Sequence, residues 1–236
     1  MSASAGQRQL APSGRLRITT SLSFAQSHLV GAVTTFLALH PQTEIELIAL
    51  ERAVNLVEER IDLTLRISNQ LEPNLVARRL GVCRSVVCAS PAYLAAAGMP
   101  RTPDDLRRHR CVGRAHVGRP EYRLTKGGQT VRIPVRGTLS ANETVVIPHG
   151  VLAGAGIGLL PTYLVGEHLR RGHLVRLLPA WEPETLGIHA LYLSHSHQPR
   201  LLRAMLDFLA ERFGPEPSWD RESAAVAKPR TRAARA

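Results

Sequence analysis

Residues 15–67 alternate between strand-like and helix-like hydrophobic patterns, and this order restricts the possible folds more than any other feature of the chain. The expected elements are, in order, a strand at 15–19, a helix at 24–39, a strand at 44–50, a short helix at 53–60 and a strand at 61–67. A βαβαβ unit of this kind forms a parallel sheet with right-handed crossovers. The first part of the chain is therefore predicted to form an α/β lobe.

After residue 75 the pattern changes, which predicts a second lobe. The expected segments are strands at 75–80 and 84–89, helices at 92–97 and 102–106, a hairpin at 122–139, a helix at 142–153, a strand at 156–160, a helix at 161–171 and a strand at 173–178. A strand at 188–194 and an amphipathic helix at 199–213 then return to the first lobe. Two crossings between the lobes predict a cleft that can close on a ligand.

The predicted fold class is therefore α/β, with two Rossmann-like lobes joined by two hinge strands. The expected division gives residues 14–89 plus 187–213 to lobe 1 and residues 90–186 to lobe 2. Residues 1–13 and 214–236 show no periodicity, and we expect both segments to be disordered. The C-terminal segment should also be dispensable for folding.

The chain carries a formal net charge of +11, from 30 Lys and Arg against 19 Asp and Glu. The tail from Arg221 to Ala236 contributes five of these basic residues against one acid. The other arginines are scattered, and aromatic residues for base stacking make up only 4% of the chain. The folded part is therefore not predicted to read nucleic acid by itself.

The thiols and the N-terminal residues favour a cytoplasmic protein. Cys83, Cys88 and Cys111 form no CxxC pair and leave one cysteine over, so we expect reduced thiols. The polar N-terminus lacks the apolar core of a signal peptide. No uninterrupted apolar run reaches the roughly 18–20 residues of a membrane span, so no membrane partner is expected.

A hydroxyl-rich turn, Thr19-Thr20-Ser21-Leu22-Ser23, joins the first predicted strand to the first predicted helix. A helix N-terminus offers free N–H groups and a positive dipole, which suits a carboxylate or another small anion. In open α/β sheets such turns face the crevice at the carboxyl ends of the strands. Capping needs a single hydroxyl, whereas this turn has four. We therefore predict that Thr20, Ser21 and Ser23 contact a ligand, the alternative being a simple helix cap.

Several stretches together resemble one known family over residues 14–213. They are GRLRI, HLV, FLALHPQTEIELIALERAVNLVEERIDLTLRI, LVARRLGVCRSVVCASPAYLAAAGMPRTPDDLRRHRCV, LSANETVV and GVLAGAGIGLLPTYLV. This ordered set resembles the effector-binding domain of LysR-type transcriptional regulators. The resemblance implies a periplasmic-binding-protein-like fold of type 2, a small-molecule effector in the cleft, and a homodimer paired through the first lobe.

The resemblance also assigns expected roles to further residues. Ser23 matches a serine that contacts effector carboxylates in some family members, and the strand end with Arg66 and Ser68 is placed at the cleft. Arg66 could instead face solvent at a sheet edge. Asn142 is placed opposite the hydroxyl turn, where it could cap a helix, contact ligand or do both, and Pro161 follows a strand that points to the cleft.

One part of the family pattern is missing. Family members carry a winged helix-turn-helix and a linker helix before the stretch that begins here at Gly14. The 13 residues before it are not helix-turn-helix material. We therefore expect DNA contact only through a helix-turn-helix that this chain does not contain.

Other chemistries find little support in the residues. The glycines at 154–158 follow a helix and precede a strand, the reverse of a dinucleotide-binding fingerprint. His195 and His197 lack a third metal ligand nearby, and no nucleophile has an identifiable base. The prediction is therefore a non-catalytic sensor without cofactor or metal, which binds a small carboxylate. The alternatives are a solute-binding protein of a transporter, which shares the two-lobe fold, and an enzyme.

Overall fold

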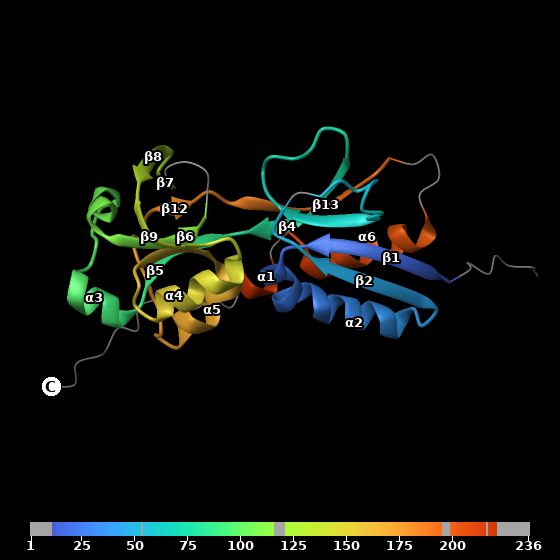
Figure 1. Ribbon diagram of the computed structural model, residues 1–236, viewed down its shortest axis with the longest axis horizontal. Helices are drawn as coiled ribbons and strands as arrows, with labels where there is room; N and C mark the ends of the chain where they lie inside the picture. Colours follow the sequence, from blue (N-terminus) through green and yellow to red (C-terminus); the bar gives the residue numbers. More distant parts are fainter. Residues whose placement is uncertain (1–10, 53, 116–120, 195–198, 216, 221–236) are drawn as a thin grey trace, which may run out of the picture.

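The computed structural model describes residues 11–52, 54–115, 121–194, 199–215 and 217–220. Within these residues the chain forms two lobes that lie side by side along the long axis, each built on a five-stranded sheet (Figure 1). The fold class is thereby confirmed as α/β with two lobes and two connecting crossings.

Lobe 1 contains the first sheet, in the strand order β2-β1-β3-β13-β4. These strands are β1 (Gly14–Thr20), β2 (Thr43–Ala49), β3 (Leu63–Ile67), β4 (Val76–Cys83) and β13 (Leu186–Tyr192). Strand β1 pairs in parallel with β2 and β3, as the βαβ order predicts, and β13 is antiparallel to both of its neighbours. Since Thr20 pairs with Ala49, the turns after β1 and β2 lie next to each other.

The helices of lobe 1 are α1 (Leu22–Phe24), α2 (Val30–Leu39) and α6 (Arg200–Phe213), and a π-helical turn, η1 (Ala25–Leu29), connects the first two. Together, α1, η1 and α2 form one helical segment of 18 residues that is long and apolar enough to cross a membrane by length and composition. One face of it is in the protein core, where Phe24, Leu29 and Phe36 pack with Met205 and Leu209 of α6. The segment therefore has the pattern of a core helix.

Lobe 2 contains the second sheet, in the order β11-β5-β10-β6-β9, and a smaller antiparallel sheet, β12-β7-β8. Its strands are β5 (Ser85–Ala89), β6 (Arg110–Arg114), β7 (Glu121–Lys126), β8 (Gln129–Pro134), β9 (Arg136–Ala141), β10 (Ile157–Pro161), β11 (Val175–Arg176) and β12 (Glu182–Pro183). Its helices are α3 (Pro91–Ala97), η2 (Pro103–Arg108), η3 (Thr144–Val146), α4 (Ile147–Leu152) and α5 (Thr162–Arg170). Helices α4 and α5 lie on the same side as α2 in the view of Figure 1.

The chain crosses between the lobes at two places that lie next to each other. The first crossing is Arg84, the single residue between β4 and β5, and the second runs through residues 184–185, just before β13. The side chain of Asn69 holds the second crossing, because its Nδ2 donates to Thr185 O at 3.0 Å and its Oδ1 accepts from Gly187 N at 2.9 Å. The predicted exit near residues 89–90 lies five residues too late, since β5 pairs with β10 and β11 in the second sheet.

The predicted helix at 53–60 is wrong for the residues that the structure describes, 54–60, of which 56–60 form turns. Asn55 Oδ1 accepts hydrogen bonds from Val57 N and Glu58 N, and the single α-helical turn closed by Glu59 N and Asn55 O does not continue. Arg60 has a φ of 54°, which ends any helical continuation. The predicted helix at 142–153 is also shorter and begins with the 3₁₀ turn η3.

The prediction that disorder begins at Gly214 does not hold for residues 217–220, which we call the C-terminal strap. Trp219 stacks on His28 with ring centroids 3.9 Å apart and also contacts Phe24 and Tyr163. Asp220 accepts hydrogen bonds from Arg84 at 2.8 Å and from Thr162 at 2.5 Å. The strap therefore joins lobe 1, the first crossing and lobe 2. Residues 221–236 and 1–10 lie outside the described residues.

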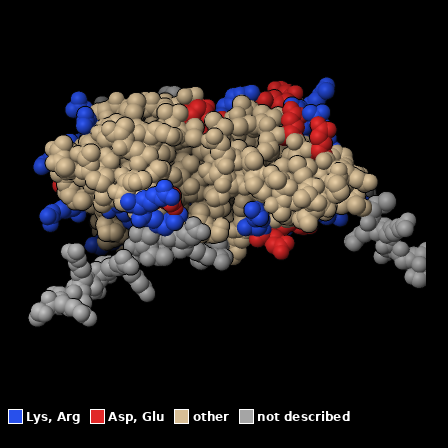
Figure 2. All heavy atoms as spheres, turned by 90° about the horizontal axis from the view of Figure 1, so that it is seen from below, with Lys and Arg blue, Asp and Glu red and all other residues tan. Residues whose placement is uncertain are grey.

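On the face seen in Figure 2, the Lys and Arg side chains form separate small groups over a largely uncharged surface. Several pair with acids, as Arg78 does with Asp207 at 2.7 Å. On this face, the residues that the structure describes therefore form no continuous basic patch of the kind that binds a nucleic-acid backbone.

Candidate functional site

A cleft of about 640 Å³ lies between the lobes and is lined by residues of both sheets. Lobe 1 contributes the turn after β1, the residues after β2, and the ends of β3 and β4. Lobe 2 contributes the ends of β6, β9 and β10, the turn η3 and the start of α5. The carboxyl ends of parallel strands therefore meet here, as expected for a ligand site in an open α/β sheet.

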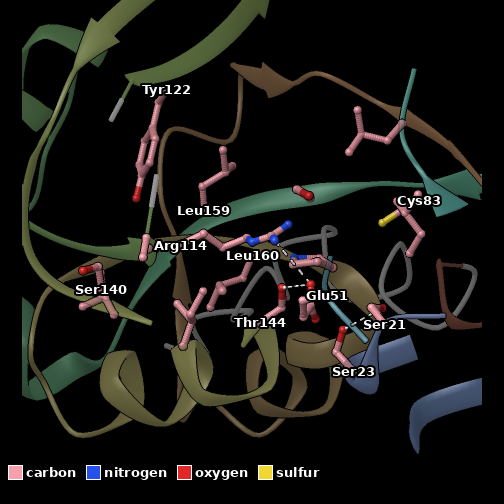
Figure 3. A pocket seen from close by; sticks show the side chains of 18 of the residues that line it. Ser21, Ser23, Glu51, Cys83, Arg114, Tyr122, Ser140, Thr144, Leu159 and Leu160 are labelled. Carbon is pink, nitrogen blue, oxygen red and sulfur yellow. Dashed lines mark hydrogen bonds and ion pairs between the residues drawn. The ribbon is translucent and has the colours of Figure 1, made fainter. Parts of the chain in front are cut away.

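The hydroxyl turn lies in this cleft (Figure 3). Ser21 is the N-cap of α1, and its Oγ accepts from Phe24 N at 3.3 Å. Ser23 is buried, and its Oγ lies 3.3 Å from Ser21 Oγ and 3.1 Å from Tyr163 Oη. Burial raises the pKa of Tyr163 well above its usual value, so its phenol keeps its proton. Hydroxyls of both lobes thus form one hydrogen-bonded chain across the cleft.

A carboxylate from lobe 1 also crosses the cleft. Glu51 follows β2, and its Oε2 lies 3.4 Å from an Arg114 guanidinium nitrogen and 3.5 Å from Thr144 Oγ1, both in lobe 2. The Glu51 side chain is 10% exposed, whereas that of Arg114 is 44% exposed. Glu51 is therefore a buried contact between the lobes at the edge of the cleft.

Arg66, near the end of β3, is the other arginine of the cleft. One guanidinium nitrogen donates to Arg52 O at 2.8 Å. Burial lowers the pKa of Arg66, which the charges of Glu72 and Glu51 partly offset, but an arginine remains protonated at neutral pH. Within the part of the chain that the structure describes, no carboxylate forms an ion pair with Arg66. It is thus a half-buried cation that faces the cleft.

Two thiols also line the cleft, those of Cys83 and Cys111. Burial raises the pKa of Cys83 to about 12 and that of Cys111 to about 11, so both remain protonated at neutral pH. The described residues that line the cleft include no histidine, and the described residues contain no group of three metal-ligating side chains. The described part of the site suits non-covalent binding, with hydroxyls, guanidinium groups and the carboxylates of Glu51 and Glu121.

The structure brings together four of the residues predicted from sequence to contact a ligand. Ser21, Ser23, Arg66 and Pro161 line the cleft. The other three do not. Thr20 is buried in β1, whereas Ser68 is engaged with the backbone of Gln70 and Asn142 is directed to Glu143 at 3.5 Å. Ser140 and Thr144, which are each two residues from Asn142 in the sequence, line the cleft in its place. His195 and His197 lie outside the described residues.

Sequence reasoning missed Glu51, Arg114, Thr144 and Tyr163. Glu51 had a usable signal, because it directly follows a predicted parallel strand, just as the hydroxyl turn does. Arg114 and Tyr163 had none, since each depends on how lobe 2 is oriented against lobe 1. Such contacts between distant parts of the chain leave no pattern in a single sequence.

Comparisons with known proteins agree on one family. The family model described as the LysR substrate binding domain matches residues 9–214. The transcriptional regulator PtxR of Pseudomonas aeruginosa is 36% identical over 207 residues, which cover 87% of this chain and 66% of the relative. The probable regulator LtrA of Klebsiella pneumoniae is 32% identical over 212 residues, which cover 88% of this chain and 69% of the relative. The chain thus spans about two thirds of the length of these relatives.

Solved structures show the same similarity. The regulatory domain of CrgA from Neisseria meningitidis superposes with a TM-score of 0.75 at 29% identity, and the match covers 86% of this chain and 100% of that one. Full-length AphB of Vibrio cholerae, a virulence activator, also gives a TM-score of 0.75, at 28% identity, and the match covers 86% of this chain and 69% of that one.

Proposed function

This chain belongs to the family of LysR substrate-binding domains, and from that premise we propose that it binds a small carboxylate-bearing effector in the cleft and thereby controls transcription. One observation carries the choice of a carboxylate: Ser21, Ser23 and Arg66 line the same cleft, and Arg66 has no ion pair within the described residues. Hydroxyls beside a helix N-terminus and a guanidinium group are donors that suit a carboxylate.

The other charged groups in the cleft are compatible with this assignment. Glu51 would repel an anion if its charge were free, but its Oε2 is paired with Arg114 and Thr144. Arg66 lies on β3, which pairs with β1. Its guanidinium group is the cation available to a ligand. We therefore propose that the ligand carboxylate binds at the Ser21 and Arg66 side of the cleft.

The remaining parts of the proposal concern partners and location. We propose a cytoplasmic protein that acts as a homodimer paired through lobe 1, without catalysis and without cofactor. The names of PtxR and LtrA describe them as HTH-type, that is, helix-turn-helix, regulators. DNA contact would come from such a helix-turn-helix unit, and not from the residues of this sequence. The solute-binding alternative is disfavoured, because the matching family and the relatives are those of transcriptional regulators.

A thermal-shift screen of small carboxylates against the matching neutral amides tests the ligand class. A carboxylate at 100 times its Kd should stabilise the protein by about 2.7 kcal/mol. Ser23→Ala removes one donor to a charged group, so the affinity for carboxylates should fall about 10- to 100-fold. Arg66→Gln should weaken the same ligands.

Thr34→Ala is the matched control, because it removes an exposed hydroxyl from the same helical segment, outside the cleft. It should leave carboxylate affinity unchanged. Amides that bind as tightly as the acids, or a Ser23→Ala protein with unchanged affinity, would contradict the proposal.

A further inference from the structure

The carboxylate of Glu51 has one oxygen that the protein does not satisfy. Its Oε2 lies near Arg114 and Thr144, whereas its Oε1 is buried and has no hydrogen-bond partner among the described residues. Only 10% of the side chain is exposed, and Glu51 lines the cleft. An unsatisfied oxygen of a buried carboxylate is costly, and native proteins nearly always supply a donor.

The position of Glu51 places this oxygen close to the proposed carboxylate site. Strands β1 and β2 are parallel with Thr20 opposite Ala49, and Leu50 N donates to Thr20 O at 2.8 Å. Leu50 therefore follows β2 at the level at which Ser21 follows β1, and Glu51 is the next residue. In the view of Figure 3 its side chain lies between Thr144 and Ser21.

Electrostatics support the same placement. Burial raises the pKa of Tyr163, and the charge of Glu51 adds to this rise. Burial lowers the pKa of Arg66, and the charges of Glu72 and Glu51 partly offset that effect. Glu51 is thus within electrostatic range of the hydroxyl chain and of the Arg66 guanidinium group. A ligand whose carboxylate faces Ser21 and Arg66 has its adjoining atoms near Glu51.

We propose that Glu51 selects, among small carboxylates, those that carry a second hydrogen-bond donor near the acid group. The inference rests on the proposed function, because it takes the ligand carboxylate as given. A hydroxyl or an ammonium group can donate to Glu51 Oε1, whereas a plain aliphatic acid leaves that oxygen unsatisfied. The ligand class is therefore hydroxy acids or amino acids.

The same carboxylate would couple ligand binding to the contact between the lobes. Its Oε2 contacts lobe 2, whereas its Oε1 has no hydrogen-bond partner among the described residues. A ligand donor that bonds to Oε1 would orient the carboxylate and so favour the Arg114 contact.

Calorimetric Kd values for matched acids test this proposal. Three sets are suitable: propanoate, lactate and alanine; succinate, malate and aspartate; 3-phenylpropanoate, 3-phenyllactate and phenylalanine. In the set of the right size, the wild-type protein should bind the hydroxy or the amino acid about 10- to 100-fold more tightly than the plain acid.

The Glu51→Gln variant distinguishes a hydroxyl donor on the ligand from an ammonium donor. Glutamine keeps an acceptor oxygen but has no charge, so a preference for the hydroxy acid should largely remain, while a preference for the amino acid should be lost. Arg114→Gln is the control, because it removes a partner of Oε2 and leaves Oε1 and the charge of Glu51 in place, so a preference for the donor-bearing acids should remain, reduced only by the part that acts through the Arg114 contact.

The outcomes distinguish the inference from the proposed function. If none of the nine acids binds, the proposed function is overturned together with the inference. If a plain acid binds as tightly as its hydroxy and amino partners, only the role of Glu51 is overturned. The same holds if Glu51→Gln leaves an amino-acid preference unchanged. The wild-type ratio provides a test even if this variant fails to fold.

Discussion

The two lobes present different groups to the cleft that they share. Lobe 1 contributes four polar side chains, those of Ser21, Ser23, Glu51 and Arg66, beside the apolar Leu50, Leu65, Ile67 and Leu186. Lobe 2 contributes an apolar wall that includes Val112, Leu139, Ile147, Leu159 and Leu160, together with Arg114, Thr144 and Tyr163. Lobe 2 therefore supplies the larger part of the lining, whereas the polar groups proposed to bind the ligand carboxylate belong to lobe 1.

The hydrophobic cores of the two lobes also differ, in how they cover the two faces of each sheet. In lobe 2, alternate residues of β5 enter different clusters: Val87 and Ala89 pack on one face of the sheet, and Val86 and Cys88 on the other. Both faces of that sheet are therefore well covered. Lobe 1 has one large cluster beneath its sheet and only a small one, around Val54, on the other face. Lobe 1 thus depends more strongly on a single core, to which Trp219 is attached.

Replacement of Trp219 by alanine should therefore produce the largest loss of stability. Its ring packs on Phe24 and His28 of lobe 1 and on Tyr163 of lobe 2. We expect the free energy of unfolding to fall by about 2–4 kcal/mol, measured by urea denaturation with far-UV circular dichroism.

The control is Trp181→Ala, since Trp181 is also partly buried but packs only in lobe 2. Its loss should be smaller, about 1–2 kcal/mol. A Trp219→Ala protein that is no less stable than Trp181→Ala would show that the C-terminal strap is not part of the core of lobe 1.

His28 of lobe 1 stacks on Trp219, and its titration predicts that the free energy of unfolding depends on pH. Burial, with a smaller contribution from Arg212, lowers the pKa of His28 from 6.5 to about 4. The unfolded chain binds a proton at this residue below pH 6.5, while the folded protein does not until about pH 4. Stability is therefore full above pH 6.5 and is lost as the pH falls toward 4.

A pKa change of this size corresponds to at most about 3 kcal/mol, and partial exposure of the ring reduces the expected loss to about 2 kcal/mol. His28→Phe keeps an aromatic ring on Trp219 but cannot titrate. Its free energy of unfolding should fall less than that of the wild type between neutral pH and about pH 4.5, as measured by urea denaturation. Equal slopes in the two proteins would exclude His28 as the source.

The smallest expected effect concerns assembly. Lobe 1 exposes Val30 and Leu39 on α2, with 49% and 62% of each residue accessible. If lobe 1 forms the dimer, Val30→Glu should weaken dimerisation about tenfold, measured by sedimentation at several protein concentrations. Met99→Glu changes an equally exposed residue in lobe 2 and should have no effect. The opposite result would assign the interface to lobe 2.

Sequence reasoning was more successful for lobe 1 than for lobe 2, and the reason is physical. The strands β1, β2 and β3 follow one another in chain order, so the rule on the carboxyl ends of parallel strands predicted Ser21 and Ser23 at the cleft, while the family resemblance implied the same position for Arg66. In lobe 2 the neighbours β5, β10 and β6 come from distant segments. Arg114 and Tyr163 therefore reach the cleft through pairings that no local pattern records.

Local patterns also failed where two extended segments adjoin. Strands β4 and β5 are separated only by Arg84, so composition gave no sign that the chain changes lobe there. The C-terminal strap was missed for another reason. A single tryptophan in a polar segment has no periodicity, and its burial depends on the pocket formed by Phe24, His28 and Tyr163.

The two crossings form a narrow hinge, because Leu186 pairs with Cys83 and the crossings are thus neighbouring strands. Motion of one lobe against the other is then mainly a rotation about a line through Arg84 and Thr185. Under such a rotation, displacement grows with distance from the axis. A small change in the angle between the lobes would therefore displace their outer ends much further than the residues that line the cleft.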